Sequence, residues 1–202
     1  LSPISNQRTD RWGGDAERRM RYPLEVIAAV REAIGDRALL YRISAVDGAV
    51  DGLDIAQTAL IARRLRDAGV DLIDVSSGGI TTDRSLDLRV RRGFAFHADF
   101  SRAMRDAGAA PVATVGLVID PAQASALVSG GDADLILLGR EMLDDPNWAQ
   151  HARRALGVDE FATWDIRHGS AIVPRLRTLE RLRADGEHPF DRFSDRSAST
   201  PS

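Results

Sequence analysis

The sequence predicts an α/β fold with a parallel β-sheet, and three observations support this prediction. Short apolar runs alternate along the chain with amphipathic stretches of helical period. The apolar runs are continuous, which is typical of strands covered by helices in a parallel sheet. Turn residues, mostly glycines and Asp-Pro pairs, separate the two kinds of segment. The 202 residues suffice for one domain with a sizeable core.

The first half of the chain contains one leading helix and two strand–helix steps. Residues 16–34 have an apolar side and a charged side, which predicts a helix. Its main part is expected to start near Pro23, because proline is tolerated in a first helical turn. Residues 39–46 and 70–76 are apolar runs of strand length. Between them, residues 54–68 begin with an aspartate that can cap a helix, and a glycine that can end it follows.

A long charged loop at 77–93 separates the first half from the second. The second half repeats the alternation, in the order helix 98–107, strand 112–115, helix 120–129, strand 134–138 and a last helix ending near Gly157. The helix at 120 opens on Asp-Pro, a capping residue followed by a proline at the first helical position. The chain therefore has four strand–helix units after one leading helix.

Four units fit two architectures. A complete (β/α)8 barrel needs about 250 residues, so four units amount to a half-barrel. A small doubly wound sheet of four strands has the same spacing, and spacing alone favours neither. Residues 158–184 are expected to form a basic helical extension to this α/β part at 1–157. Residues 185–202 are polar and rich in turn formers, so we expect a disordered tail.

Composition excludes several classes of protein. The formal net charge of −3 implies no basic face, which argues against nucleic acid as a partner. The absence of cysteine removes disulfides and thiolate chemistry. No apolar run reaches about 18 residues, so we expect no membrane span. The N-terminus lacks the features of a signal peptide, and a cytoplasmic protein is expected.

A phosphate site is indicated where the last two strands end. Gly139-Arg140 directly follows the apolar run at 134–138, and Gly116 follows the run at 112–115. Glycine lets a ligand approach the backbone, and arginine offers a fork of donors to phosphate oxygens. Because the last two loops of a barrel commonly bind phosphate, the pair predicts a phosphorylated cofactor.

Arg42 lies in the middle of an apolar strand, where a cation is costly unless it is paired. Strand alternation places it on the face of Leu40 and Ser44. An inward arginine near the end of a strand suits an electron-rich ligand atom. The alternative is an ion pair with a neighbouring aspartate such as Asp74, and the sequence leaves both open.

The histidines show no spacing typical of a metal site, and we predict none. They are His97, His151, His168 and His188. His97 stands where a loop meets a helix. It could face a ligand there, but the simpler expectation is a surface histidine. The sequence also lacks a Walker loop, a dinucleotide-binding glycine motif and a serine nucleophile elbow.

The N-terminal segment is rich in turn formers and local hydrogen-bonding residues, so its own side chains should order it. It reads Ser2-Pro3-x-x-Asn6-x-Arg8-x-Asp10-x-Trp12-Gly13-Gly14, followed by Glu17-x-Arg19-x-Arg21-Tyr22-Pro23. This motif closely resembles the Old Yellow Enzyme family of FMN-dependent NAD(P)H oxidoreductases, in the subfamily of bacterial NADPH dehydrogenases and ene-reductases. The similarity continues in order to about residue 157, through Arg42-Ile43-Ser44-Ala45, 69–78, 115–117 and 138–146.

The resemblance implies a TIM (β/α)8 barrel of which this chain supplies about the last four βα units. It implies that Gly139 and Arg140 hold the FMN phosphate, with the backbone near Gly116 beside them. Arg42 would contact the flavin ring near N1 and the C2 oxygen. NAD(P)H would reduce FMN, which would then pass hydride to an activated alkene or enone. Trp164 and His168 resemble a terminal segment that some members use for subunit contacts, which leaves room for a homo-oligomer.

The family's substrate-binding histidine pair and tyrosine proton donor would precede Leu1, so the resemblance assigns no catalytic residue to this chain. A half-barrel has open edge strands, and the chain begins with Leu. We therefore expect further sequence upstream and no turnover by the 202 residues alone. The alternative is a non-catalytic half-barrel that binds a phosphorylated ligand or self-assembles into a closed barrel.

Overall fold

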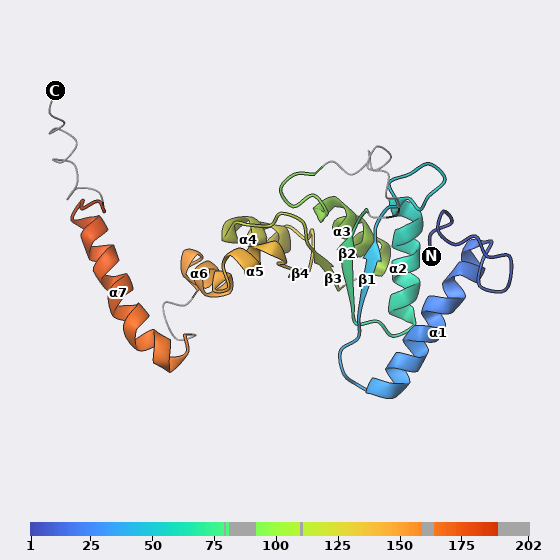
Figure 1. Cartoon of the computed structure of the whole chain (residues 1–202), viewed down its shortest axis with the longest axis horizontal. Coiled ribbons are helices and arrows are strands. Elements are labelled where there is room, and N and C mark those ends of the chain that lie inside the picture. Colours follow the sequence, from blue (N-terminus) through green and yellow to red (C-terminus); the bar gives the residue numbers. More distant parts are fainter. Residues whose placement is uncertain (79, 81–91, 110, 159–163, 190–202) are drawn as a thin grey trace, which may run out of the picture. The chain divides into compact units, whose positions relative to one another are not determined.

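The computed structural model describes residues 1–78, 80, 92–109, 111–158 and 164–189 (Figure 1). The chain falls into two compact units, Leu1–Trp148 and Ala149–Ser202. Most of the loop predicted at 77–93 and the end of the predicted tail, 190–202, lie outside the described residues. Within the described part, no helix combines the length and apolarity that crossing a bilayer requires.

The first unit is built on a four-stranded parallel sheet, as the sequence predicts. Its strands are β1 (Leu40–Ser44), β2 (Leu72–Ser76), β3 (Val112–Thr114) and β4 (Leu135–Ile136). Their order in the sheet, β1-β2-β3-β4, is their order in the chain, so each strand pairs with its sequence neighbours. Every pair is parallel, which requires the helical crossovers that the alternating pattern indicates.

The two faces of the sheet differ in burial. Arg42, Asp74, Ala113 and Leu135 are register partners across the four strands and therefore share one face. On this face the Arg42 side chain is 60% exposed and Leu135 is 50% exposed. On the other face Ile43, Val75 and Thr114 are buried. The core thus lies between the sheet and its helices. The opposite face is exposed on the edge strands β1 and β4, whereas Leu72 and Ala113 of the central strands are buried.

The described part of this unit also contains helices. They are α1 (Ala16–Ile34), α2 (Ile55–Asp67), α3 (Ala98–Met104), the π-helix η1 (Arg105–Ala109), α4 (Pro121–Ser129) and α5 (Arg140–Asp144). α2 packs against β2, α3 and η1, and α1 packs against α2 (Figure 1). The core residues include Met20 from α1, Leu65 from α2 and Met104 from α3.

The prediction that the main part of the first helix starts near Pro23 is wrong. Asp15 caps α1 by accepting a hydrogen bond from the backbone N–H of Arg18 at 2.8 Å, so the helix begins at Ala16. Pro23 lies inside the helix, and its ring is buried. Packing of the ring against the core offsets the helical hydrogen bond that proline cannot donate. The short helix α5 was not predicted.

A capping box starts α2. The Asp54 carboxylate accepts from the Gln57 backbone N–H at 2.8 Å, and the Gln57 side chain accepts from the Asp54 N–H at 3.2 Å. This reciprocal pair satisfies two helix-end donors and positions the helix that covers β2.

Replacing Asp54 with alanine is expected to lower the free energy of unfolding by about 1 kcal/mol, because a helix-end donor loses its acceptor. Urea unfolding followed by circular dichroism measures the change. Asp67→Ala, at the other end of α2, is the matched control and should leave stability unchanged or slightly raised, since a carboxylate is unfavourable at a helix C-terminus. Equal losses from both variants would contradict the capping argument.

The second unit contains most of α6 (Trp148–Ala155) and all of α7 (Ile166–Ala184). α7 lies within the helical extension expected at 158–184 and begins at Ile166, because Asp165 caps it by accepting from the Arg167 N–H at 2.9 Å. Arg154 and Glu180 form an ion pair at 3.1 Å between the two helices. Leu176 is the buried apolar residue of α7.

Candidate functional site

A cleft of about 280 Å³ lies among residues that follow β3 and β4, beside Arg42 of β1. Its lining consists of Arg42, Phe96, His97, Val115, Gly116, Leu117, Val118, Leu137, Leu138, Gly139, Arg140 and Glu141. All four residues predicted from the sequence to contact a cofactor are in this set. The parallel sheet brings them together because its carboxyl-end loops meet at one edge.

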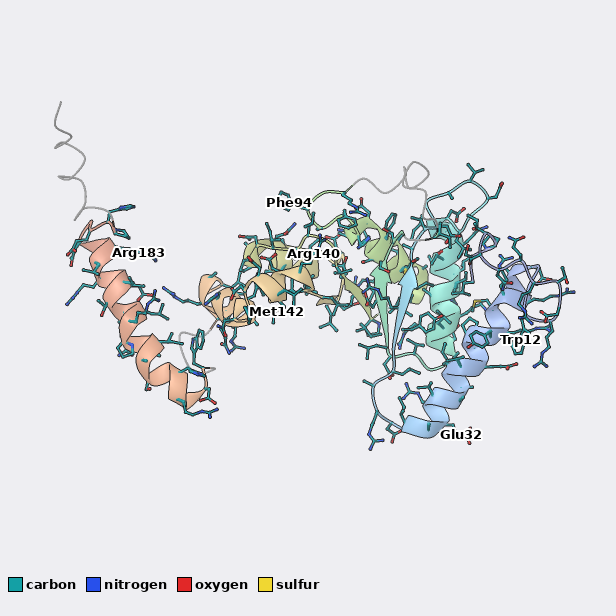
Figure 2. All side chains as sticks on the ribbon, viewed as in Figure 1. Trp12, Glu32, Phe94, Arg140, Met142 and Arg183 are labelled. Atoms are coloured by element: carbon teal, nitrogen blue, oxygen red, sulfur yellow. The ribbon has the colours of Figure 1, made fainter. Side chains whose placement is uncertain are left out.

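Gly139 and Arg140 form the β4 side of the cleft. A Cβ atom built on Gly139 would meet no atom within 4 Å, so the space in front of this backbone is open. Arg140, labelled in Figure 2, is the first residue of α5 and is exposed. Within the described residues its guanidinium forms no ion pair. A cation at an open backbone is a ready partner for an anionic group.

Gly116 forms the β3 side of the cleft and must be glycine for two reasons. Its φ of +113° lies in a region that other residues rarely adopt. A Cβ atom there would lie 2.9 Å from Cε1 of Phe96 and 3.0 Å from Nδ1 of His97. The two rings can therefore approach the turn after β3 this closely only because residue 116 is glycine.

Arg42 forms an ion pair with Asp74, its register partner on β2, at 2.9 Å. The alternative left open by the sequence, a structural pair with Asp74, is thus observed. Asp74 is only 14% exposed, and its Oδ1 is buried without a hydrogen-bond partner in the described residues. Arg42 nevertheless remains 60% exposed and lines the cleft, so the same guanidinium can face a ligand.

His97 is 5% exposed, so the prediction of a surface histidine is wrong. Its Nε2 lies 2.7 Å from the Ser77 hydroxyl, and its Nδ1 lies 2.9 Å from the Val115 carbonyl oxygen. The ends of β2 and β3 enclose the ring from two sides, and sequence patterning cannot show an enclosure made by segments 20 and 18 residues away.

The surroundings of His97 keep its ring neutral. Burial lowers its pKa from 6.5, and the positive charge of Arg42 lowers it further, while the bond to Val115 and the charge of Asp74 act in the opposite direction. The carbonyl of Val115 can only accept, so Nδ1 carries the proton. Nε2 then accepts from the Ser77 hydroxyl at neutral pH.

The spacing of residues around the start of α3 could have indicated that His97 is buried. His97, Ser101 and Met104 are spaced by four and three residues, and all three are buried. The apolar face of α3 thus extends back to the residue before its start, where His97 occupies the N-cap position. Phe96 also contacts His97, with 4.1 Å between the centroids of the two rings, and no sequence pattern predicted this contact.

The cleft carries little net charge. Its lining has two cations, Arg42 and Arg140, and one carboxylate, Glu141, so one positive charge remains while His97 is neutral. Asp74 compensates Arg42 from just outside the lining. Arg140 is therefore the cation best placed to act on a negatively charged ligand.

Two larger cavities lie elsewhere, and neither contains a predicted site residue. One, of about 420 Å³, is lined by the N-terminal segment, where Arg8 pairs with Asp10 and Arg19 donates to the carbonyls of Leu1 and Gly14. Both arginines that line this cavity are therefore already engaged by other groups of the chain. The other, of about 530 Å³, is an open groove on α1 and α2.

The N-terminal segment is ordered by its own side chains, as predicted. The buried Ser2 hydroxyl accepts from the Ile4 N–H at 3.1 Å, and the Asn6 amide donates to the Trp12 carbonyl at 2.9 Å. The Asp10 carboxylate accepts from the Trp12 N–H at 3.1 Å. These bonds fix a turn that precedes α1 and lies outside the cleft lining.

Comparison with solved structures supports the fold. The complex of morphinone reductase with tetrahydroNAD matches with a TM-score of 0.55 and 25% identity, over 77% of this chain and 39% of that one. A 2-naphthoyl-CoA reductase complex matches with a TM-score of 0.62 and 24% identity, over 80% and 24%. The parallel sheet is part of a TIM barrel of the kind these enzymes contain, which confirms the predicted fold.

Comparison with known sequences gives the family. The chain is 40% identical over 158 residues to an NADPH dehydrogenase of Geobacillus thermodenitrificans, over 78% of this chain and 45% of the relative. It is 38% identical over 159 residues to an NADPH dehydrogenase of Bacillus subtilis, over 79% and 45%. The chain thus spans about half the length of the relatives it matches. The sequence model of one family matches residues 1–158, and the chain belongs to that NADH:flavin oxidoreductase / NADH oxidase family.

Proposed function

We propose that the cleft binds FMN and that this chain supplies the phosphate-binding part of an NAD(P)H-dependent flavin oxidoreductase. The observation that carries the proposal is the convergence of Arg42, Gly116, Gly139 and Arg140 on one cleft. Arg42, Gly116 and the Gly139-Arg140 pair are far apart in the sequence and belong to three different strands or the turns that follow them. The family and the NADPH dehydrogenase relatives support the same cofactor and reductant.

The chemistry of the lining fits FMN. Its phosphate needs donors, and Arg140 offers a guanidinium beside the open backbone of Gly139. Its ring needs an apolar wall, which Val118 and Leu138 supply. The volume of about 280 Å³ lies at the small end of ligand sites, so these residues would enclose part of the cofactor.

Each predicted residue has a distinct role in this proposal. Gly139 and Arg140 hold the phosphate, and the turn at Gly116 leaves room beside it. Arg42 would face the flavin ring, where its positive charge would stabilise negative charge on the ring. Bound FMN supplies hydride chemistry between NAD(P)H and an acceptor, for which we propose an activated alkene.

An FMN titration of the chain tests the proposal. We expect saturable quenching of flavin fluorescence, and weaker binding of riboflavin, which lacks the phosphate. Arg63→Ala, which removes an exposed arginine on α2 outside the cleft lining, should bind FMN as the original chain does. A folded chain that binds neither flavin would contradict the assignment of the cleft. Steady NADPH-driven alkene reduction would contradict our expectation that these residues alone lack turnover.

The exposed residues of the two edge strands favour a second candidate function, a half-barrel that closes by pairing with another copy. Leu40 and Leu135 are 54% and 50% exposed on the edge strands β1 and β4. Such apolar edges are prone to association. A homo-oligomer measured by light scattering that binds inorganic phosphate as tightly as FMN would favour this function over a flavin enzyme.

A further inference from the structure

His97 is a buried titratable residue of the cleft that the proposed FMN contacts do not use. Both ring nitrogens are engaged, Nδ1 with the Val115 carbonyl and Nε2 with the Ser77 hydroxyl. The ring can therefore offer no nitrogen to a ligand without breaking one of these bonds. This arrangement points away from proton transfer and toward positioning.

The two bonds join three separate segments of the fold. Ser77 directly follows β2, Val115 directly follows β3, and His97 precedes α3. The Ser101 hydroxyl adds a third hydrogen bond by donating to the His97 carbonyl at 3.1 Å. Nδ1 of His97 would also lie 3.0 Å from any Cβ at Gly116, so the ring touches the turn that lines the cleft.

We propose that His97 is a positioning residue, whose Nδ1–H and Nε2 hold the Val115–Gly116 turn and the end of β2 in the geometry that receives the cofactor. This inference rests on the proposed function for the identity of the cofactor. The two hydrogen bonds of the His97 ring involve only residues of this chain.

These two hydrogen bonds require the neutral tautomer of His97 in which Nδ1 carries the proton. Arg42 and Asp74 are the charged groups that act on His97, with opposite signs, and Asp74 is paired with Arg42. Burial disfavours the charged ring further. A second proton would turn Nε2 into a donor. The hydrogen bond with Ser77 would then run in the opposite direction, with the hydroxyl as the acceptor.

Three variants separate the hydrogen bonds from the volume of the ring. His97→Gln keeps one donor and one acceptor, whereas His97→Phe keeps an aromatic ring and loses both. Ser77→Ala removes only the Nε2 partner. We expect FMN affinity to fall about tenfold in His97→Phe and clearly less in His97→Gln, since a buried carbonyl loses its donor only in the first. Ser77→Ala should add little further loss when combined with His97→Phe.

Nuclear magnetic resonance provides a readout that does not depend on FMN. In the original chain at pH 7, ring nitrogen shifts should show Nδ1 protonated and Nε2 unprotonated. The Gly116 amide should exchange faster with solvent in His97→Phe than in His97→Gln. A charged ring or the opposite tautomer would overturn the proposal, as would unchanged FMN affinity in a folded His97→Phe. If the original chain binds no FMN, the proposed function fails, and the tautomer and exchange measurements still decide the role of His97.

Discussion

Arg140→Ala is expected to weaken FMN binding about a hundredfold, the largest effect on affinity that the cleft allows. A charge-assisted hydrogen bond contributes about 1.5–3 kcal/mol, and a guanidinium can make two of them to one phosphate. Arg42 cannot compensate, because its charge is shared with Asp74. Glu141 would remain in the lining and oppose the phosphate.

Fluorescence titration measures this change, and two controls isolate its cause. Riboflavin affinity should be equal in the original chain and in Arg140→Ala, because the ring keeps its contacts. Arg140→Lys should retain part of the affinity, since lysine keeps the charge and loses the planar fork. Equal weakening of FMN and riboflavin would indicate that Arg140 acts on the ring or on folding, which would refute the phosphate role.

Gly116→Val is expected to lower the free energy of unfolding by about 3 kcal/mol, through backbone strain and overpacking together. The φ of +113° disfavours a β-branched residue. The new side chain would also overlap the rings of Phe96 and His97, which are held in place by packing and by hydrogen bonds.

Gly139→Ala, on the opposite side of the same cleft, is the matched control for stability. Its φ of −98° and the open space around it predict a change within about 0.5 kcal/mol, as for most surface substitutions. Chemical denaturation of the two variants measures the difference. Similar stability losses at both positions would contradict the contact of Gly116 with the two rings.

The local elements and the strand-end residues could be predicted from the sequence. Apolar runs and helical periods located all four strands, and Asp54 marked the start of α2 because capping depends on residues close in the chain. Gly116, Gly139 and Arg140 were recognisable because parallel strands place their carboxyl ends at one edge.

Contacts between distant segments could not be predicted in the same way. The burial of His97 depends on Ser77 and Val115, which reach it from two other strand ends. The two interpretations of Arg42 were treated as alternatives, although a half-exposed guanidinium can pair with Asp74 and still line the cleft. The start of α1 differs from the predicted one because the packing of the Pro23 ring is a tertiary property, whereas the Asp15 cap is local and marks the start at Ala16.

The strands lie in the sheet in the same order as in the chain, and this affects how the protein can fold during synthesis. Each new strand can add to the edge left by the previous one, so the sheet can grow in the direction of translation without inserting a strand between two others. The hydrophobic core between β1, β2 and α2 needs no residue beyond β3 to begin forming. Arg140, the proposed phosphate-binding residue, is synthesised only after β4. A nascent chain would thus acquire a stable sheet before it acquires an anion-binding edge.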